Sequence, residues 1–473
     1  MTRLAIINPS ATLATLAALG LAMGLLGSAQ AAEPPTYAIE PCCNICPQAQ
    51  ADATYAGDMD EFNKLVQGQQ DWLFRTRTDL MTHMGTTADG YKHLQNLRDE
   101  LDKHGVELMV VYIPTRGMIN ADMLSPEVRQ GYDLQLAKSN YLAVVERMRS
   151  MGIKVPDLTP LLEQHGDAKK PYFFKRDHHW TPYGAEFTAE LVAAELRKSE
   201  AFKQIPRKEF VSRGDGQNNK IGSLNQALGK ICGYSFANQF VTRFVTEPKE
   251  ESSDLFGDTA AAEVILAGTS FSAPQYNFAG FLKEKAAVDV DNRSISGGGF
   301  HSAMLQYLGS QDFQDNPPKI LIWEITSYYD ISMPLFYRQI MPMLANGCRA
   351  SQATMSNKVA LRPGLNEVLI NSRDLPLRSE KYLADIQFSQ PNVMELRSSL
   401  WYMSGSRETL NISRNQQVEP DGRFVFGLRD DPEWSGQTLL SLEIEMPADM
   451  PAGLEVEATI CPRQAAIQTA LAD

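Results

Sequence analysis

The fold is decided by the stretch Glu263-Val264-Ile265-Leu266-Ala267-Gly268-Thr269-Ser270-Phe271-Ser272, in which an apolar run meets a glycine and small polar residues. An aliphatic run without polar alternation is typical of a strand that is buried on both faces. We expect the strand to stop at the glycine and a helix to begin directly after Ser270. That junction would place Ser270 at the carboxyl end of a parallel sheet, where open α/β folds bind their ligands.

Similar patterns extend outward from this stretch in both directions. Further strands are predicted at residues 106–112, 153–157, 286–290 and 319–323. Helices, marked by apolar residues three or four apart, are predicted at residues 89–104, 136–151 and 182–197. Apolar strands that alternate with helices predict an α/β domain whose parallel sheet is covered on both faces.

After about Leu344 the sequence pattern changes. Short alternating stretches at residues 366–370, 423–427 and 439–444 are separated by Pro, Gly and Asp turns. Several short strands with frequent turn signals predict a small all-β sandwich. We therefore expect an α/β domain over residues 32–345 and a β-sandwich domain over residues 346–473.

The first residues have the pattern of a secretory signal. Arg3 is the only charge before Glu33, an apolar run covers residues 11–26, and the run ends in Ser28-Ala29-Gln30-Ala31. We predict a signal peptide over residues 1–31 that is cleaved after Ala31. The alternative is an uncleaved membrane anchor. In either case the remainder of the chain lies outside the cytoplasm.

The cysteines agree with export. An even count of six in an exported protein favours disulfides over a metal site. Cys348 and Cys461 bracket the last quarter of the chain and are expected to pair. Cys232 is expected to pair with Cys46 or a neighbour in the cluster Cys42-Cys43-Asn44-Ile45-Cys46. Zinc is the weaker alternative for this cluster, because no second Cys/His pair stands at finger spacing.

The charge of the chain restricts its partners. The formal net charge is −13, and loss of Arg3 with the signal lowers it to −14. This balance argues against a nucleic-acid partner. An acidic protein that handles an acidic polymer would need a local basic groove.

Two motifs carry the residue types of nucleophilic catalysis. In Asp177-His178-His179-Trp180-Thr181-Pro182, an Asp two residues before His179 can hold the imidazole in one tautomer and leave Nε2 free as a base. Ser270, after its strand, would be the nucleophile. The alternatives are a local hydrogen-bonded turn, half of a metal site at the two histidines, and a helix N-cap at the serine. The presence of both motifs favours catalysis, and no HxxxH or HExxH spacing supports a metal.

These motifs resemble those of the SGNH-hydrolase-like acetyltransferases of bacterial exopolysaccharide systems. The resemblance also includes residues 71–75 (DWLFR), 111–116 (VYIPTR) and 322–325 (IWEI), and it covers nearly the whole mature chain. In that family the Asp-x-His pair precedes the serine, as it does here. Because the residue between Asp177 and His179 is a second histidine, an exchange of roles between His178 and His179 stays open.

The resemblance implies a periplasmic O-acetyltransferase that needs no cofactor or metal. Ser270, with His179 as base and Asp177 orienting it, would carry an acetyl group to mannuronate hydroxyls of alginate. The donor would be delivered by inner-membrane acetylation proteins, and the partners would be proteins of the alginate secretion complex. Tyr276 and Tyr328 are the oxyanion candidates, although each could simply be packed in the core. An acetylesterase and a non-catalytic polymer-binding component are the alternative functions.

The β-domain resembles a carbohydrate-binding module. Residues 397–407 place two arginines around a Trp-Tyr pair. Arginine can pair with a uronate carboxylate and an indole can stack on a sugar ring. Arg397, Ser399, Trp401 and Arg407 are therefore the polysaccharide-binding candidates. The alternative places Trp401 in the sandwich core.

Overall fold

The computed structural model describes residues 45–163, 170–249 and 262–463. The predicted signal peptide and the cysteines Cys42 and Cys43 lie outside these ranges. Among the described residues, no helix has both the length and the apolar character needed to cross a membrane.

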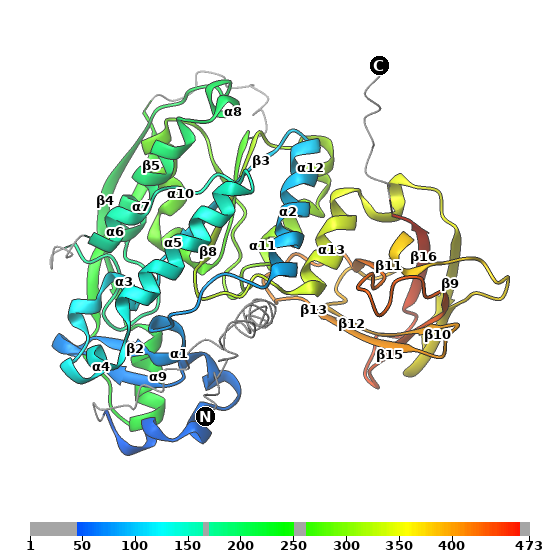
Figure 1. The fold of residues 1–473 in the computed structure, drawn as a ribbon, viewed down its shortest axis with the longest axis horizontal. Helices are drawn as coiled ribbons and strands as arrows, with labels where there is room; N and C mark the ends of the chain where they lie inside the picture. The colour runs from blue at the N-terminus through cyan, green and yellow to red at the C-terminus, as the bar shows by residue number, and fades with distance from the viewer. Residues whose placement is uncertain (1–44, 164–169, 250–261, 464–473) are drawn as a thin grey trace, which may run out of the picture. The chain divides into compact units, whose positions relative to one another are not determined.

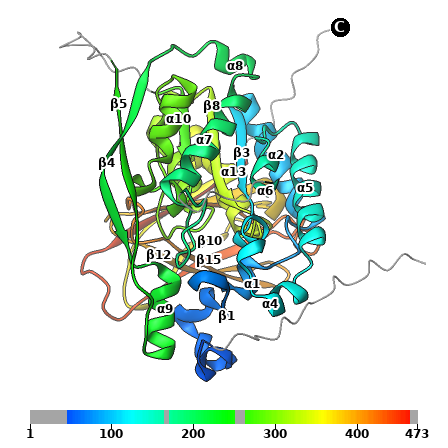
Figure 2. The same cartoon turned by 90° about the vertical axis from the view of Figure 1, so that its left-hand side faces the viewer.

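The first domain is built on a parallel sheet in the order β3-β8-β6-β7. Val264–Ala267 pairs with Ile320–Trp323, and Glu107–Ile113 pairs with the other side of the same strand. Helices flank this sheet on both sides (Figures 1 and 2). The predicted α/β class with a parallel sheet is confirmed.

The strands of this domain are β1 Leu65–Gln67, β2 Leu73–Arg75, β3 Glu107–Ile113, β4 Phe210–Lys220, β5 Gln239–Pro248, β6 Val264–Ala267, β7 Asp291–Asn292 and β8 Ile320–Thr326. The helices are α1 Thr76–Asp79, α2 Ala88–Lys103, α3 Arg116–Ile119, α4 Pro126–Gly131, α5 Leu134–Ser150, α6 Thr159–Glu163, α7 Pro182–Leu196, α8 Glu200–Lys203, α9 Ser223–Cys232, α10 Phe278–Ala286, α11 Ser302–Leu308, α12 Gln311–Asp315 and α13 Pro334–Leu344.

Two predicted strands are wrong. The run at residues 286–290 begins as the end of α10, turns at Ala287 (φ 52°), and buries Val288 and Val290 without pairing as a strand. At residues 153–157, only Lys154 makes a bridge, with Met109. Any short segment that is buried needs apolar residues. An apolar run of five residues therefore does not distinguish a strand from a buried loop.

The chain after Ser270 also differs from the prediction. Two 3₁₀ turns, η6 (Ser270–Ser272) and η7 (Pro274–Tyr276), precede α10, which begins only at Phe278. Pro274 opens the second turn. Proline can start a helical turn but has no N–H with which to continue a preceding one. The turn that begins at Ser270 is therefore short, and Ser270 does not open a long helix.

A two-stranded antiparallel ribbon, β4 with β5, extends beyond the main sheet. Helix α9 lies between these strands in the chain and ends at Cys232, which is joined to Cys46 by a disulfide. The disulfide ties the ribbon segment to the first described residues of the chain, where a small apolar cluster includes Ile45 and Leu228.

The second domain is a sandwich of two antiparallel four-stranded sheets, β10-β15-β12-β13 and β14-β11-β16-β9. Burial alternates along Arg407–Ser413, so that one face is solvated and the other packs between the sheets. Cys348 and Cys461 form a disulfide in this domain. Its strands are β9 Met355–Ala360, β10 Gly364–Ile370, β11 Tyr382–Phe388, β12 Glu395–Tyr402, β13 Arg407–Ser413, β14 Arg423–Gly427, β15 Leu439–Met446 and β16 Glu455–Pro462.

Helix α13 packs against β14 and joins the two domains (Figure 1). Arg338 on α13 pairs with Glu408 on β13, with 2.5 Å between Nη1 and Oε1, and donates from Nε to the carbonyl of Gly427. Both charged side chains are largely buried. A buried pair resists separation strongly, because removing one partner leaves the other charge without compensation.

Candidate active site

The Asp177–His179 loop is held by its own chain and by a buried arginine. Phe173 and Trp180 bridge across the loop, and Thr181 caps α7 by accepting from the N–H of Gly184. The guanidinium of Arg116, which follows β3, donates to the backbone carbonyls of Phe174 (2.6 Å) and Asp177 (2.5 Å). The loop is therefore positioned at the carboxyl end of β3.

Ser270, His179 and Asp177 form one chain of hydrogen bonds. Ser270 Oγ lies 2.7 Å from His179 Nε2, and His179 Nδ1 lies 2.6 Å from Asp177 Oδ1. The backbone N–H of His179 also donates to Asp177 Oδ1 at 2.9 Å. The indole N–H of Trp180 donates to the carbonyl of Phe271, which joins the histidine loop to the serine turn. The geometry is that of a nucleophile, a base and an orienting carboxylate.

The surroundings of Asp177 and His179 set the protonation states of these two side chains. Burial alone would raise the pKa of Asp177, but the hydrogen bond and charge of His179, together with Lys220, hold it well below its usual range. Burial lowers the pKa of His179 below 6.5, against the opposing effect of Asp177. At neutral pH the ionised Asp177 accepts from Nδ1–H, and the unprotonated Nε2 accepts from the Ser270 hydroxyl.

The serine turn is attached to β8 through Glu324. This fully buried carboxyl accepts from the N–H of Thr269 at 2.8 Å, from Thr269 Oγ1 at 3.1 Å, and from Ser272 Oγ at 3.0 Å. Burial raises the pKa of Glu324 to about 7, although these donors oppose the rise. Gly268 permits the close approach, because a Cβ there would lie 2.7 Å from Glu324 Oε2. Glu324 therefore fixes the turn that carries Ser270.

Comparison with known proteins matches both domains. Residues 65–327 match the family described as an SGNH hydrolase-like domain, acetyltransferase AlgX, and residues 347–472 match a C-terminal carbohydrate-binding module. The alginate biosynthesis protein AlgX of Pseudomonas aeruginosa is 48% identical over 452 residues, which cover 94% of this chain and 95% of that protein. The chain belongs to the AlgX family.

Two further relatives define how far the likeness extends. AlgX of Azotobacter vinelandii is 40% identical over 94% of this chain and 95% of its own length. The protein named probable alginate O-acetylase AlgJ, of Pseudomonas aeruginosa, is 27% identical over 56% of this chain and 70% of its own. The solved structure of Pseudomonas aeruginosa AlgX superposes with a TM-score of 0.83 and covers 88% of this chain and 99% of that one.

Several residues of this AlgX-family site give little signal in the sequence. Lys220 lies in a polar stretch, and Ser223 is an ordinary helix-terminal serine. Their contacts with the Asp177 loop arise only because the β4–α9 turn folds over it. Glu324 could have been found, since it is a charged residue inside the apolar run of β8. A carboxylate within such a strand is seldom present without a local task.

Of the two tyrosines predicted to serve as oxyanion donors, Tyr276 contacts the triad, whereas Tyr328 contacts Arg75. The ring of Tyr276 stacks on the imidazole of His179, with 5.1 Å between centroids, and is almost fully buried. Tyr328 is partly buried, and the guanidinium of Arg75 lies over its ring at 5.2 Å. Each tyrosine is thus held by aromatic or cationic contacts, and the oxyanion role of its hydroxyl stays a prediction.

The polysaccharide-binding candidates lie on one face of the sandwich. Arg397, Ser399 and Trp401 alternate along β12, and Arg407 is directly opposite Trp401 on β13. The Arg407 guanidinium lies over the Trp401 ring at 5.3 Å and donates to Ser399 Oγ at 3.1 Å. Trp401 is partly exposed and its indole N–H donates to Glu443, so the alternative placement of Trp401 in the core is wrong.

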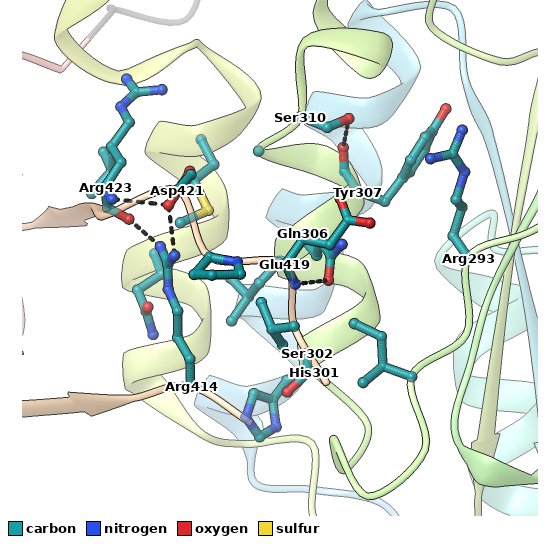
Figure 3. Close-up of a pocket in the computed structure, with 18 of the residues that line it drawn as sticks. Arg293, His301, Ser302, Gln306, Tyr307, Ser310, Arg414, Glu419, Asp421 and Arg423 are labelled. Atoms are coloured by element: carbon teal, nitrogen blue, oxygen red, sulfur yellow. Dashed lines mark hydrogen bonds and ion pairs between the residues drawn. The ribbon is translucent and has the colours of Figure 1, made fainter. Parts of the chain in front are cut away.

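A pocket of about 650 Å³ lies away from the triad, between α11, α12 and the segment that leads into β14 (Figure 3). None of the triad residues lines it. Arg293 pairs there with Asp312, and Arg414 pairs with Asp421. Because these guanidiniums already have carboxylate partners, we assign no ligand to the pocket.

Asp177, His178 and His179 also satisfy a simple geometric test for metal binding, with one ligand atom each within 4.8 Å of the others. The hydrogen bonds of the two histidines indicate a role other than metal binding. His178 Nδ1 lies 2.7 Å from Ser223 Oγ, and His179 Nδ1 is bonded to Asp177. Burial and the neighbouring His179 hold the pKa of His178 well below its usual value, so His178 is neutral. Its bond with Ser223 also favours His179 as the base.

Proposed function

We propose that this AlgX-family protein transfers acetyl groups to mannuronate hydroxyls of alginate, through an acetyl-serine formed on Ser270. The observation that carries the proposal is the hydrogen-bonded chain from Ser270 through His179 to Asp177 at the carboxyl end of a parallel sheet. The names of the relatives support alginate as the polymer and acetyl transfer as the reaction.

In the first half of the reaction, Ser270 Oγ attacks the carbonyl carbon of an acetyl donor. His179 Nε2 takes the hydroxyl proton and passes it to the leaving group of the donor when the tetrahedral intermediate collapses. Asp177 stabilises the imidazolium that forms in between. The backbone N–H of Ser270 and the hydroxyls of Tyr276 and Tyr328 are the proposed donors to the oxyanion.

In the second half, a polymer hydroxyl attacks the acetyl-serine. His179 accepts the proton of that hydroxyl and returns a proton to Ser270 Oγ as the ester bond to the serine breaks. The products are an O-acetylated sugar and free enzyme, so no redox cofactor is needed. If water attacks in place of the sugar, the same residues give an acetylesterase, and exclusion of water decides between the two outcomes.

The sandwich domain is proposed to hold the polymer near the site. Trp401 offers a partly exposed ring for stacking on a sugar, and Arg397 and Arg407 offer guanidiniums for uronate carboxylates. Arg397 is exposed and already paired with Glu395. It can bind the polymer only if a uronate carboxylate replaces Glu395 as its partner. We expect Trp401→Ala to weaken binding of defined mannuronate oligomers by more than about 1 kcal/mol in calorimetry, and exposed Met403→Ala to leave it unchanged.

The proposed location is the periplasm. The predicted signal peptide and the two disulfides, Cys46–Cys232 and Cys348–Cys461, support it, because disulfides persist in oxidising compartments. The proposed partners are inner-membrane acetylation proteins that deliver the donor and proteins of an alginate secretion complex. A fusion to a reporter that folds only outside the cytoplasm tests the location directly.

Mass spectrometry of the protein after incubation with a small activated acetyl ester tests the chemistry. We expect an acetyl adduct on Ser270 in the wild type, its absence in Ser270→Ala and His179→Ala, and its loss on addition of unacetylated polymannuronate with the acetyl group recovered on the polymer. Ser404→Ala, an exposed serine of the sandwich, is the matched control.

The other outcomes separate the alternatives. An adduct that decays at the same rate with and without polymer would identify an esterase. A Ser270→Ala variant that retains full polymer acetylation would refute the proposed mechanism and favour a polymer-binding component without catalysis.

A further inference from the structure

Lys220, the last residue of β4, extends into the triad from outside the two catalytic loops. Its ammonium donates to Tyr276 Oη at 2.9 Å and lies 3.4 Å from Asp177 Oδ2. Only about a quarter of the side chain is exposed. A largely buried ammonium is costly unless it is paired, so these two contacts determine its position.

The turn after Lys220 is shaped to make this approach. Gly222 has φ 91°, a conformation that favours glycine, and a Cβ there would lie 2.2 Å from the carbonyl of Arg176. The next residue, Ser223, donates its backbone N–H to Asp177 Oδ2 at 2.8 Å. One short segment therefore supplies two donors to the carboxylate oxygen that His179 does not use.

Lys220 is one of several charged or titratable groups around the His179 imidazole. The groups that act on His179 are Asp177 and His178 on its own loop, Lys220 on β4, Tyr276 on η7 and Arg75 on β2. Asp177 alone favours the protonated imidazole. Lys220 is the only one of these cations that also contacts the carboxylate, so it limits how strongly Asp177 attracts a proton to His179.

We infer that Lys220 is a positioning residue of the proposed acetyl transfer: its ammonium anchors Asp177 and Tyr276 and keeps His179 unprotonated, so that the imidazole is ready to accept the serine proton. Lys220 touches neither the reacting atoms nor Ser270. Its hydrogen bond to Tyr276 Oη uses a lone pair of that oxygen, which leaves the phenolic hydrogen free to donate elsewhere. The inference rests on the proposed function and extends it to the ribbon.

The ionisation of the surrounding groups agrees with this role. Burial alone would lower the pKa of Lys220, but Asp177 and Tyr276 raise it above its ordinary value, so the ammonium stays charged. The same ammonium adds to the lowering of the His179 pKa by burial. Replacing Lys220 with a neutral side chain therefore raises the pKa of His179, because repulsion is lost and Asp177 is left less compensated.

The test compares wild type with Lys220→Met, Lys220→Gln and Lys220→Arg. The rate of Ser270 acetylation by a small activated ester is measured from pH 5 to 9, and the His179 imidazole is titrated by NMR in the same proteins. For both neutral variants we expect the midpoint of the acid limb to rise by about one pH unit, with about tenfold slower acetylation below the midpoint. The KM for the ester should not change, and Lys220→Arg should restore the profile.

Lys230→Met is the matched control, since Lys230 lies exposed on α9 and has the same chemistry. A wild-type His179 midpoint in both neutral variants would overturn the inference. A raised KM with an unchanged midpoint would also overturn it, because Lys220 would then be a substrate contact. The NMR titration remains decisive even if wild type forms no acetyl-serine, so failure of the proposed function is distinguishable from failure of this inference.

Discussion

Replacing Gly268 with alanine puts one methyl group into the contact between the serine turn and Glu324. The added Cβ would lie 2.7 Å from Glu324 Oε2, 2.9 Å from Ser272 Oγ and 3.1 Å from Glu324 Cβ. Ordinary contacts of a Cβ begin near 3.4 Å. Glu324 is enclosed in the core and cannot rotate away, so the turn that carries Ser270 must move by roughly half an ångström.

That displacement sets the expected size of the effect. A misplacement of about 1 Å at a reacting group costs on the order of 100-fold in rate, which corresponds to about 2.7 kcal/mol. Half of this displacement predicts a loss of about tenfold in the acetylation rate of Ser270. Overpacking adds a loss of about 1–3 kcal/mol in the free energy of unfolding.

Burst kinetics with an activated acetyl ester, together with thermal unfolding, measure both effects. Gly214→Ala in β4 is the matched control, because its Cβ would meet only the end of the Thr242 side chain, at 3.2 Å. A Gly268→Ala variant with a wild-type rate of acetylation would refute the reasoning. So would a rate loss equal to that of the control, since the effect would then not come from the contact with Glu324.

Three further outcomes follow from the same structure. Because burial lowers the pKa of His179 below 6.5, serine acetylation should fall as the pH drops through a midpoint that lies below 6.5. A midpoint above 7 in the burst rate would contradict this. Removal of the Cys348–Cys461 disulfide, which spans 113 residues, should lower the free energy of unfolding by about 4–5 kcal/mol, and an unchanged denaturant midpoint after its removal would argue against it. Arg338→Ala leaves Glu408 buried without its partner and should lower the free energy of unfolding by about 3–5 kcal/mol. A loss below about 1 kcal/mol in chemical unfolding would show that Glu408 does not depend on Arg338 for compensation of its charge.

Some of the site was predictable because it is local. Asp177 and His179 are two residues apart, and a carboxylate at that spacing can reach both the backbone N–H and Nδ1 of the histidine. The position of Ser270 at the end of a buried strand follows from the apolar run before it. Glu324 was detectable for a related reason, since it interrupts an otherwise apolar strand.

The contact between the two motifs was not predictable from local pattern. Ser270 and His179 are 91 residues apart in the chain. The parallel order of the strands, together with the Trp180–Phe271 hydrogen bond, brings Ser270 Oγ to 2.7 Å from His179 Nε2. Lys220 gives no signal of its own, because an isolated lysine in a polar stretch is usually solvated. Its role depends on a ribbon whose path over the Asp177 loop is a tertiary property.

The sequence by itself determined the two-domain organisation, the parallel α/β class and the positions of the long helices α2, α5 and α7 and of strands β3, β6 and β8, because hydrophobic periodicity is a property of each segment alone. Only the tertiary structure decided that the run at residues 286–290 is buried loop, that Trp401 stays partly exposed, and that Lys220 contacts Asp177 and Tyr276. The physical reason is that burial and charge pairing depend on which distant segments approach one another, and short-range pattern does not record that approach.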